Sequence, residues 1–135
     1  MSARGVGNAA ENKAVKDLES EGYLVERARP DLRWIGPGRC RSMAHDFFET
    51  FDLLAIYNDA TNSAKARIRL IQITASNAVN ERRKKVAAIE SRMPSVIELE
   101  VWRWRKGRAL KSDRKPRGWI KEYYDRINQI WVVFS

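Results

Sequence analysis

The sequence predicts an α/β domain in which a small mixed β-sheet is flanked by helices. The chain has 135 residues, 44% of them hydrophobic, which is enough for one domain over residues 1–135 with a buried core. Apolar residues recur at helical spacing in some segments and alternate as in strands in others. These segments follow one another in the order helix, strand, strand, strand, helix, strand, that is α-β-β-β-α-β.

The first helix is predicted from about residue 9 to residue 21. Asn8 and Glu11 have the spacing of a capping box, and the apolar stripe that follows consists of Ala10, Ala14, Val15 and Leu18. The alternating stretch YLVERA, residues 23–28, predicts a short strand. Residues 27–41 and 106–117 are rich in Arg, Lys, Gly and Pro, so both segments are expected to be exposed basic loops.

A β-hairpin is predicted near the centre of the sheet. Two apolar runs, residues 51–57 and 68–74, flank a turn that is rich in Asn, Asp, Ser and Thr. Asn77 can cap a second helix, and Pro94 ends it.

Residues 97–104 alternate between apolar and charged side chains and predict a further strand. Trp102 and Trp104 share one face of it, which favours packing in the core or in a dimer interface. The remaining signals are weaker: a turn or short strand at residues 119–124 and an apolar terminus at residues 130–134.

Composition points to an acidic partner. The formal charge is +9 and the pI is about 10.1, so nucleic acid is the first candidate. With one cysteine, Cys40, and one histidine, His45, the chain has neither an intramolecular disulfide nor a Cys/His zinc cluster. It carries no run of membrane-spanning length and no hydrophobic signal core, and we expect a cytoplasmic protein that does not enter membranes.

Basic residues are concentrated in ERRKK, residues 81–85, at the start of the second predicted helix. A charge run of this kind can be a solvated helix face, but with a net charge of +9 we expect it to contact DNA phosphates. The residues predicted to bind DNA are Arg4, Arg33, Arg41, Arg82, Arg83, Lys84 and Lys85.

A polar pair interrupts the apolar strand RLIQIT. Gln72 and Thr74 are two residues apart and project to one face, where Asp52, at the start of the preceding strand, can lie beside them. Glu11 from the first helix adds a second acid. Each residue also has a structural interpretation: a core hydrogen-bond pair for Gln72 and Thr74, a loop contact for Asp52, and a capping box for Glu11.

This order of elements, with Glu11, Asp52 in FDLLAI and Gln72 in RLIQIT, resembles the PD-(D/E)XK nuclease superfamily, particularly its archaeal Holliday junction resolvase and phage branches. The resemblance implies a restriction-endonuclease-like core, a metal-dependent endonuclease that acts on branched or junction DNA, and a homodimer. It implies that Asp52 is the principal ligand of Mg²⁺ or Mn²⁺, with Glu11 as a second ligand and Gln72 as a neutral one. Thr74 would orient the attacking water.

The chain departs from the family pattern at two positions. Thr74 stands where the family has lysine, and Gln72 where it most often has glutamate. An amide oxygen ligates a cation without adding charge, and threonine supplies no positive charge. Candidate substitutes for the lysine are Lys13, Lys84 and Lys85. Asp46 and Glu49 are acids that could supply the missing charge, and His45 a base, although surface roles are the alternative for all three.

Two other functions are compatible with the sequence. The first is a catalytically inactive DNA-binding module with a nuclease-like fold. The second is a basic structural or RNA-binding protein in which the polar cluster is a hydrogen-bond network of the core.

Overall fold

The computed structural model describes residues 3–28, 31–43, 46–48, 50–62, 65–75, 78–105 and 118–134. Its elements are α1 (Ala3–Ser20), β1 (Leu24–Arg27), β2 (Asp31–Gly36), β3 (Arg39–Met43), β4 (Leu53–Tyr57), β5 (Arg67–Thr74), α2 (Val79–Ile89), a 3₁₀ turn η3 (Glu90–Arg92), β6 (Ile97–Arg105), β7 (Gly118–Asp125) and β8 (Ile130–Phe134). No helix in the described ranges is long and apolar enough to cross a membrane.

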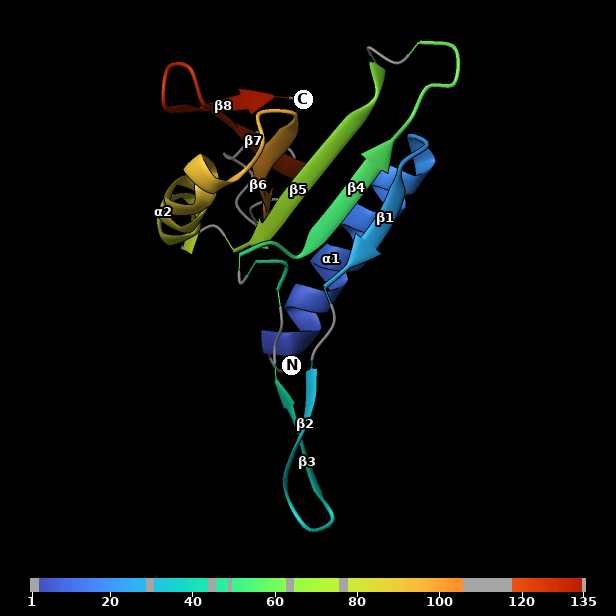
Figure 1. The fold of residues 1–135 in the computed structure, drawn as a ribbon, viewed down its shortest axis with the longest axis vertical. Helices are drawn as coiled ribbons and strands as arrows, with labels where there is room; N and C mark the ends of the chain where they lie inside the picture. Colours follow the sequence, from blue (N-terminus) through green and yellow to red (C-terminus); the bar gives the residue numbers. More distant parts are fainter. Residues whose placement is uncertain are drawn as a thin grey trace, which may run out of the picture.

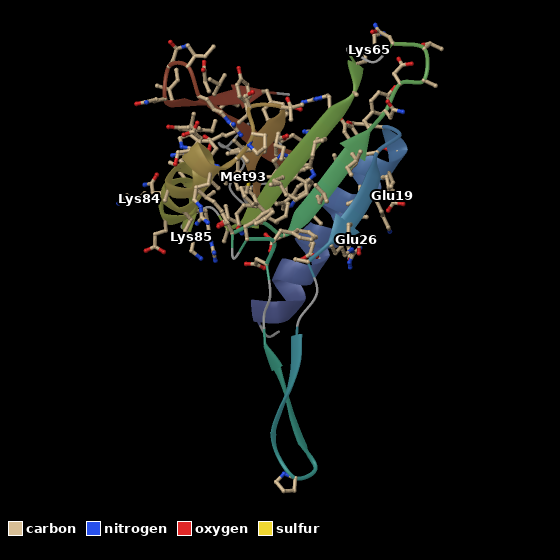
Figure 2. All side chains as sticks on the ribbon, viewed as in Figure 1. Glu19, Glu26, Lys65, Lys84, Lys85 and Met93 are labelled. Carbon is tan, nitrogen blue, oxygen red and sulfur yellow. The ribbon has the colours of Figure 1, made fainter. Side chains whose placement is uncertain are left out.

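The main sheet has six strands in the order β1-β4-β5-β6-β7-β8, and it is mixed because β5 and β6 run parallel while the other pairs are antiparallel. This confirms the predicted α/β class and the central hairpin, which is β4 and β5. The turn of that hairpin, marked by Lys65, lies at one end of the sheet (Figure 2). A separate two-stranded ribbon, β2 and β3, extends from the opposite end (Figure 1).

The two helices cover opposite faces of the sheet. Two consecutive residues of β5 show this, because neighbouring residues of a strand point to opposite sides. Ile71 of β5 packs with Leu18 of α1 in one apolar cluster. Leu70, the residue before it, packs with Val86 of α2 in the other. The sheet is therefore buried on both faces where α1 and α2 cover it.

Two expectations for the chain were wrong. Helix α1 begins at Ala3, so Asn8 lies inside the helix and does not form an N-terminal capping box with Glu11. Residues 31–43, expected as part of a basic loop, form the β2–β3 ribbon, whose turn contains Gly38 in a left-handed conformation (φ +70°). Trp102 is fully buried, which confirms core packing, one of the two roles expected for the tryptophans of this strand.

Two further expectations lie outside the described residues: the cap at Asn77 and the basic loop at residues 106–117. The helix predicted from residue 77 is present as α2 from Val79, and η3 ends it before Pro94. Both weak C-terminal signals are strands, β7 and β8, which extend the sheet beyond the predicted elements.

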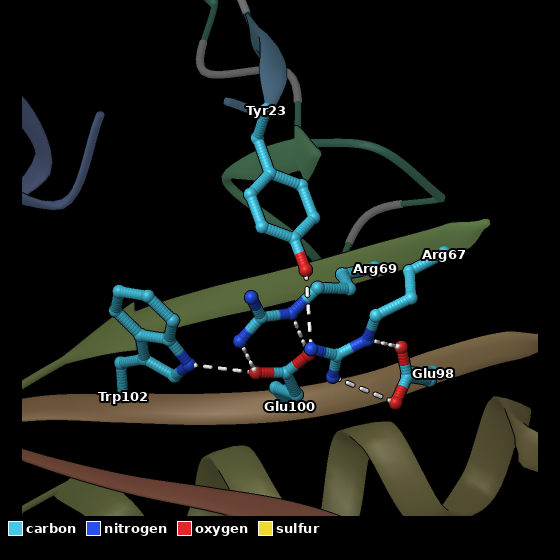
Figure 3. Close-up of polar contacts among 6 residues, drawn as sticks. All are labelled: Tyr23, Arg67, Arg69, Glu98, Glu100 and Trp102. Carbon is cyan, nitrogen blue, oxygen red and sulfur yellow. Dashed lines mark hydrogen bonds and ion pairs between the residues drawn. The ribbon is translucent and has the colours of Figure 1, made fainter. Parts of the chain in front are cut away.

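A polar network joins β5 to β6 on the α1 face (Figure 3). The Arg69 guanidinium donates two hydrogen bonds of 2.6 Å to Glu100, and the Trp102 indole N–H donates to the same carboxylate at 2.9 Å. Arg67 donates to Glu98 at 2.7 and 2.9 Å in the same way. The two ion pairs differ in burial: the Arg69 and Glu100 side chains are 3% and 1% exposed, while those of Arg67 and Glu98 are 41% and 39% exposed.

We predict that Glu100→Gln lowers the free energy of unfolding by about 3–5 kcal/mol, because the charge of Arg69 then lies buried without its partner. The matched variant Glu98→Gln breaks the exposed pair and is expected to cost about 0–1 kcal/mol. Urea unfolding of both variants beside the wild type gives the two values. Equal losses in both variants would contradict the distinction between the buried and the exposed pair.

Candidate functional site

Asp52 is held at the end of the sheet where β4 begins and β5 ends. Its backbone N–H donates to the carbonyl of Ile71 at 3.0 Å, and its carbonyl accepts from the N–H of Ala28 at 2.9 Å. The β4–β5 register pairs Leu53 with Ile71, so Asp52 comes opposite Gln72, one residue further along. The hairpin thus produces the predicted meeting of these two side chains.

The Gln72 side chain is fixed by the groups around it. Its amide Nε2 donates to Asp52 Oδ2 at 2.8 Å and to the Ile73 carbonyl at 2.9 Å, while the Ile73 N–H also donates to Asp52 Oδ2 at 2.8 Å. Both acceptors face Nε2, so the amide cannot be reversed without setting oxygen against oxygen. The other amide atom, Oε1, is buried and accepts no hydrogen bond, and the residue is only 3% exposed.

Burial raises the pKa of Asp52 from 3.8 to about 7, against the opposing effect of the Ile73 hydrogen bond. The charges of Asp46 and Glu11 raise the pKa further, and Arg82 lowers it. Asp52 therefore lies near two acids and one cation. At a pKa of about 7, its carboxyl group loses its proton only near neutral pH.

Glu11 faces this end of the sheet from α1. Burial raises its pKa, the charge of Arg27 lowers it, and the charge of Asp46 raises it. Glu11, Asp46 and Asp52 are thus close enough to influence one another electrostatically. Sequence reasoning placed Glu11 and Asp52 together, and it proposed Asp46 as a further acid; Glu49 and His45 lie outside the described residues.

Thr74 does not join the hydrogen bonds around Asp52. Its hydroxyl donates to the Ala75 carbonyl at 3.2 Å, and the side chain is partly exposed. The lysines considered as substitutes for a cation at this position lie elsewhere. Lys13 places its ammonium 4.3 Å from the centre of the Trp104 ring, and Lys84 and Lys85 are exposed on the outer side of α2 (Figure 2).

The residues predicted to bind DNA divide into two groups. Arg83 is engaged within the protein: it donates both to Asn80 at 3.0 Å and to the buried carboxylate of Glu122, at 2.8 Å from Nε. Arg82 has no ion-pair partner in the described part of the chain, and Lys84 and Lys85 are exposed. The side chains of Arg4, Arg33 and Arg41 are outside the description; the backbone register of the ribbon pairs Arg33 with Arg41.

The donors at this end of the sheet suit a hard divalent cation in chemical type. Carboxylate and amide oxygens are what Mg²⁺ prefers, and the buried Oε1 of Gln72 is an acceptor that lacks a donor, beside the carboxylate of Asp52. Within the described ranges, no three His, Cys, Asp or Glu side chains converge on one point as ligands. The protein would therefore supply few direct ligands to a divalent cation. Water or phosphate oxygens would supply the other ligands.

Sequence reasoning missed Arg103 of β6, which the register sets directly opposite Thr74. The alternation of WRWR indicated its face on the strand, but not which strand would lie beside it.

Comparison of the chain with models of protein families, with curated protein sequences and with solved structures gave no match.

We predict a pH dependence of stability that belongs to Asp52. Its folded-state pKa is raised, so between about pH 4 and pH 7 the unfolded chain has lost the proton that the folded protein keeps. The free energy of unfolding should therefore fall with rising pH, relative to Asp52→Asn, by at most about 4 kcal/mol, and the difference should level off above pH 7.

Urea unfolding of both proteins from pH 4 to pH 8 measures this difference. Asp59→Asn is the control, because hydrogen bonds from Thr61 lower the pKa of Asp59. The contribution of that carboxylate is complete above its unfolded pKa, so the difference between the wild type and Asp59→Asn should stay constant from pH 4 to pH 8. Parallel curves for the wild type and Asp52→Asn would show that Asp52 ionises normally.

Proposed function

We propose that the chain is a DNA-binding endonuclease with a restriction-endonuclease-like core that hydrolyses phosphodiester bonds with Mg²⁺ or Mn²⁺, on branched or junction DNA. The observation that carries the proposal is the pairing of Asp52 with Gln72 at the sheet end, where a buried amide oxygen lacks a donor beside a carboxylate. The core order α1-β1-β4-β5-α2-β6 is the order that the family resemblance implies.

In this proposal Asp52 and the amide oxygen of Gln72 hold the cation, and Glu11 contributes directly or through a water. The bound cation supplies a Lewis acid for the phosphate and lowers the pKa of a bound water. In the hydrolysis a water would add to phosphorus while the bond from phosphorus to one ester oxygen breaks, and a proton would go to the departing oxygen. Without the cation, burial keeps the pKa of Asp52 near 7, so a bound cation would favour the charged form of this carboxylate.

The basic surface supports a DNA substrate. Lys84, Lys85 and Arg82 lie on α2, and Arg82 is near enough to Asp52 to lower its pKa. Phosphates bound along α2 would therefore pass close to the carboxylate. The net charge of +9 supplies long-range attraction for the same ligand.

A second function is favoured by one observation: the hydrogen-bond donors of the cluster are already bonded within the protein. Gln72 uses both amide hydrogens within the protein, and the Thr74 hydroxyl bonds to a neighbouring carbonyl. A protein that bound DNA without cutting it would keep these bonds permanently. The alternative is therefore a catalytically inactive DNA-binding module.

We predict that Asp52→Asn abolishes Mg²⁺- or Mn²⁺-dependent cleavage while DNA binding is retained or tighter, because the change removes a negative charge near the phosphate. Gln72→Glu should tighten metal binding by adding a charged ligand. Nicking and cleavage of branched, flapped and linear duplexes measure activity, and binding in EDTA measures affinity.

Lys65→Ala, at the far end of the sheet, is the control and should change neither activity nor affinity (Figure 2). A wild type that binds DNA but cuts none of these substrates with either metal would establish the inactive module. A wild type that binds no DNA would exclude both functions.

The proposal includes a homodimer formed through β8. This strand is at the edge of the described sheet, and its Ile130 and Val133 side chains are 53% and 64% exposed. An exposed apolar edge strand is suited to pairing with a second copy about a two-fold axis. Sedimentation at micromolar concentrations should find a dimer, and Val133→Lys should shift it to monomer. A wild-type monomer over that range would refute this interface.

A further inference from the structure

Arg103 on β6 is a cation that has no ion-pair partner in the described part of the chain. Its Nε atom is buried and makes no hydrogen bond, and no described carboxylate lies within ion-pair distance of its guanidinium. The arginines of β5 are arranged differently, since Arg67 and Arg69 each hold a glutamate of β6 through two hydrogen bonds. A partly buried guanidinium without such a partner is positioned to bind an anion.

The nearest acid on the same face is already neutralised. The β6–β7 register pairs Val101 with Glu122 and Arg103 with Ile120, so Glu122 lies diagonally across from Arg103. Arg83 binds both carboxylate oxygens of Glu122 from α2. Glu122 and Arg103 thus lie in diagonal positions on this face, and Glu122 pairs with Arg83 instead of Arg103.

Arg103 lies on the same face as the candidate site. The parallel register of β5 and β6 sets Gln72 opposite Val101 and Thr74 opposite Arg103, and register partners on adjacent strands project to one side. Thr74, which is partly exposed, therefore follows Gln72 on this face of β5 and lies opposite Arg103. The acids Glu11 and Asp46 lie near Asp52, which is hydrogen-bonded to Gln72.

We propose that Arg103 and Thr74 form a subsite for a phosphate oxyanion, so that the positive charge missing from β5 is supplied by the adjacent strand. The inference rests on the proposed function and names the group that binds the phosphate being cleaved. Guanidinium N–H groups bind two phosphate oxygens at once, and the Thr74 hydroxyl can donate to a third by giving up its 3.2 Å bond to the Ala75 carbonyl. Arg103 then stabilises the negative charge that develops on those oxygens.

The first test measures phosphate binding without DNA or metal. At constant ionic strength, replacing chloride with inorganic phosphate should raise the Tm of the wild type by about 2–4 °C. Arg103→Met keeps the apolar stem in place and removes the charge, so it should lose this shift. Arg103→Lys should keep part of it. Equal shifts in the wild type and Arg103→Met, or no shift in either, would overturn the subsite.

The second test uses the β5–β6 register, which sets Thr74 opposite Arg103. Arg103→Met should slow metal-dependent cleavage about 10²–10³-fold and lower the slope of log K against log salt for duplex binding in EDTA by about 0.9, one phosphate contact. Adding Thr74→Lys to Arg103→Met returns a cation to the opposite position and should recover cleavage. A structural role for Arg103 would not produce that recovery, whereas Lys65→Ala should leave every measurement unchanged.

These results separate the two proposals. If the wild type cuts no DNA, the nuclease proposal fails, but the phosphate shift and the salt slope still decide whether Arg103 binds the anion. If the wild type cuts DNA and Arg103→Met cuts it equally well, the subsite fails and the nuclease proposal stands.

Discussion

The parallel pairing of β5 with β6 depends on the buried ion pair between Arg69 and Glu100. Neither charge can be buried alone without a large cost, and the bidentate geometry at 2.6 Å satisfies both. Glu98 lies on the same face two residues earlier, so a two-residue slip of β6 would give Arg69 to Glu98 and leave Glu100 without a cation. The pair thereby fixes the register that, on the other face, sets Thr74 opposite Arg103.

The same register separates charge across one end of the sheet. Asp52 precedes β4, and the acids near it are Glu11 and Asp46, so negative charge gathers on the β4 side. Arg103, near the end of β6, lies on the other side, with β5 between them. A phosphate bound to the cationic side would be adjacent to a metal bound on the acidic side. Electrostatic complementarity to both ligands thus follows from strand order.

Local patterns predicted those parts of the molecule that depend on neighbours in sequence. The β4–β5 hairpin has a short connection, so the meeting of Asp52 with Gln72 could be inferred from alternation and turn composition alone. The position of Arg103 depends on a parallel crossover through α2, which sequence periodicity does not specify. Lys13 was considered as the missing cation, yet the phase of α1 carries it to Trp104. Such placements are set by packing between elements distant in sequence.

The two departures from the family pattern belong together electrostatically. A glutamate and a lysine on one strand carry no net charge, and neither do Gln72 and Thr74, so the exchange leaves the charge of β5 at this end unchanged. The amide of Gln72 donates to Asp52, which allows that carboxylate to be buried beside it, where a second carboxylate would repel it. Compared with the family pattern that the chain resembles, β5 lacks a group that binds an anion, and the guanidinium of Arg103, which has no ion-pair partner among the described residues, is in register to supply one. In the proposed site, the polar pair of the apolar strand is therefore one half, and the other half lies on the next strand.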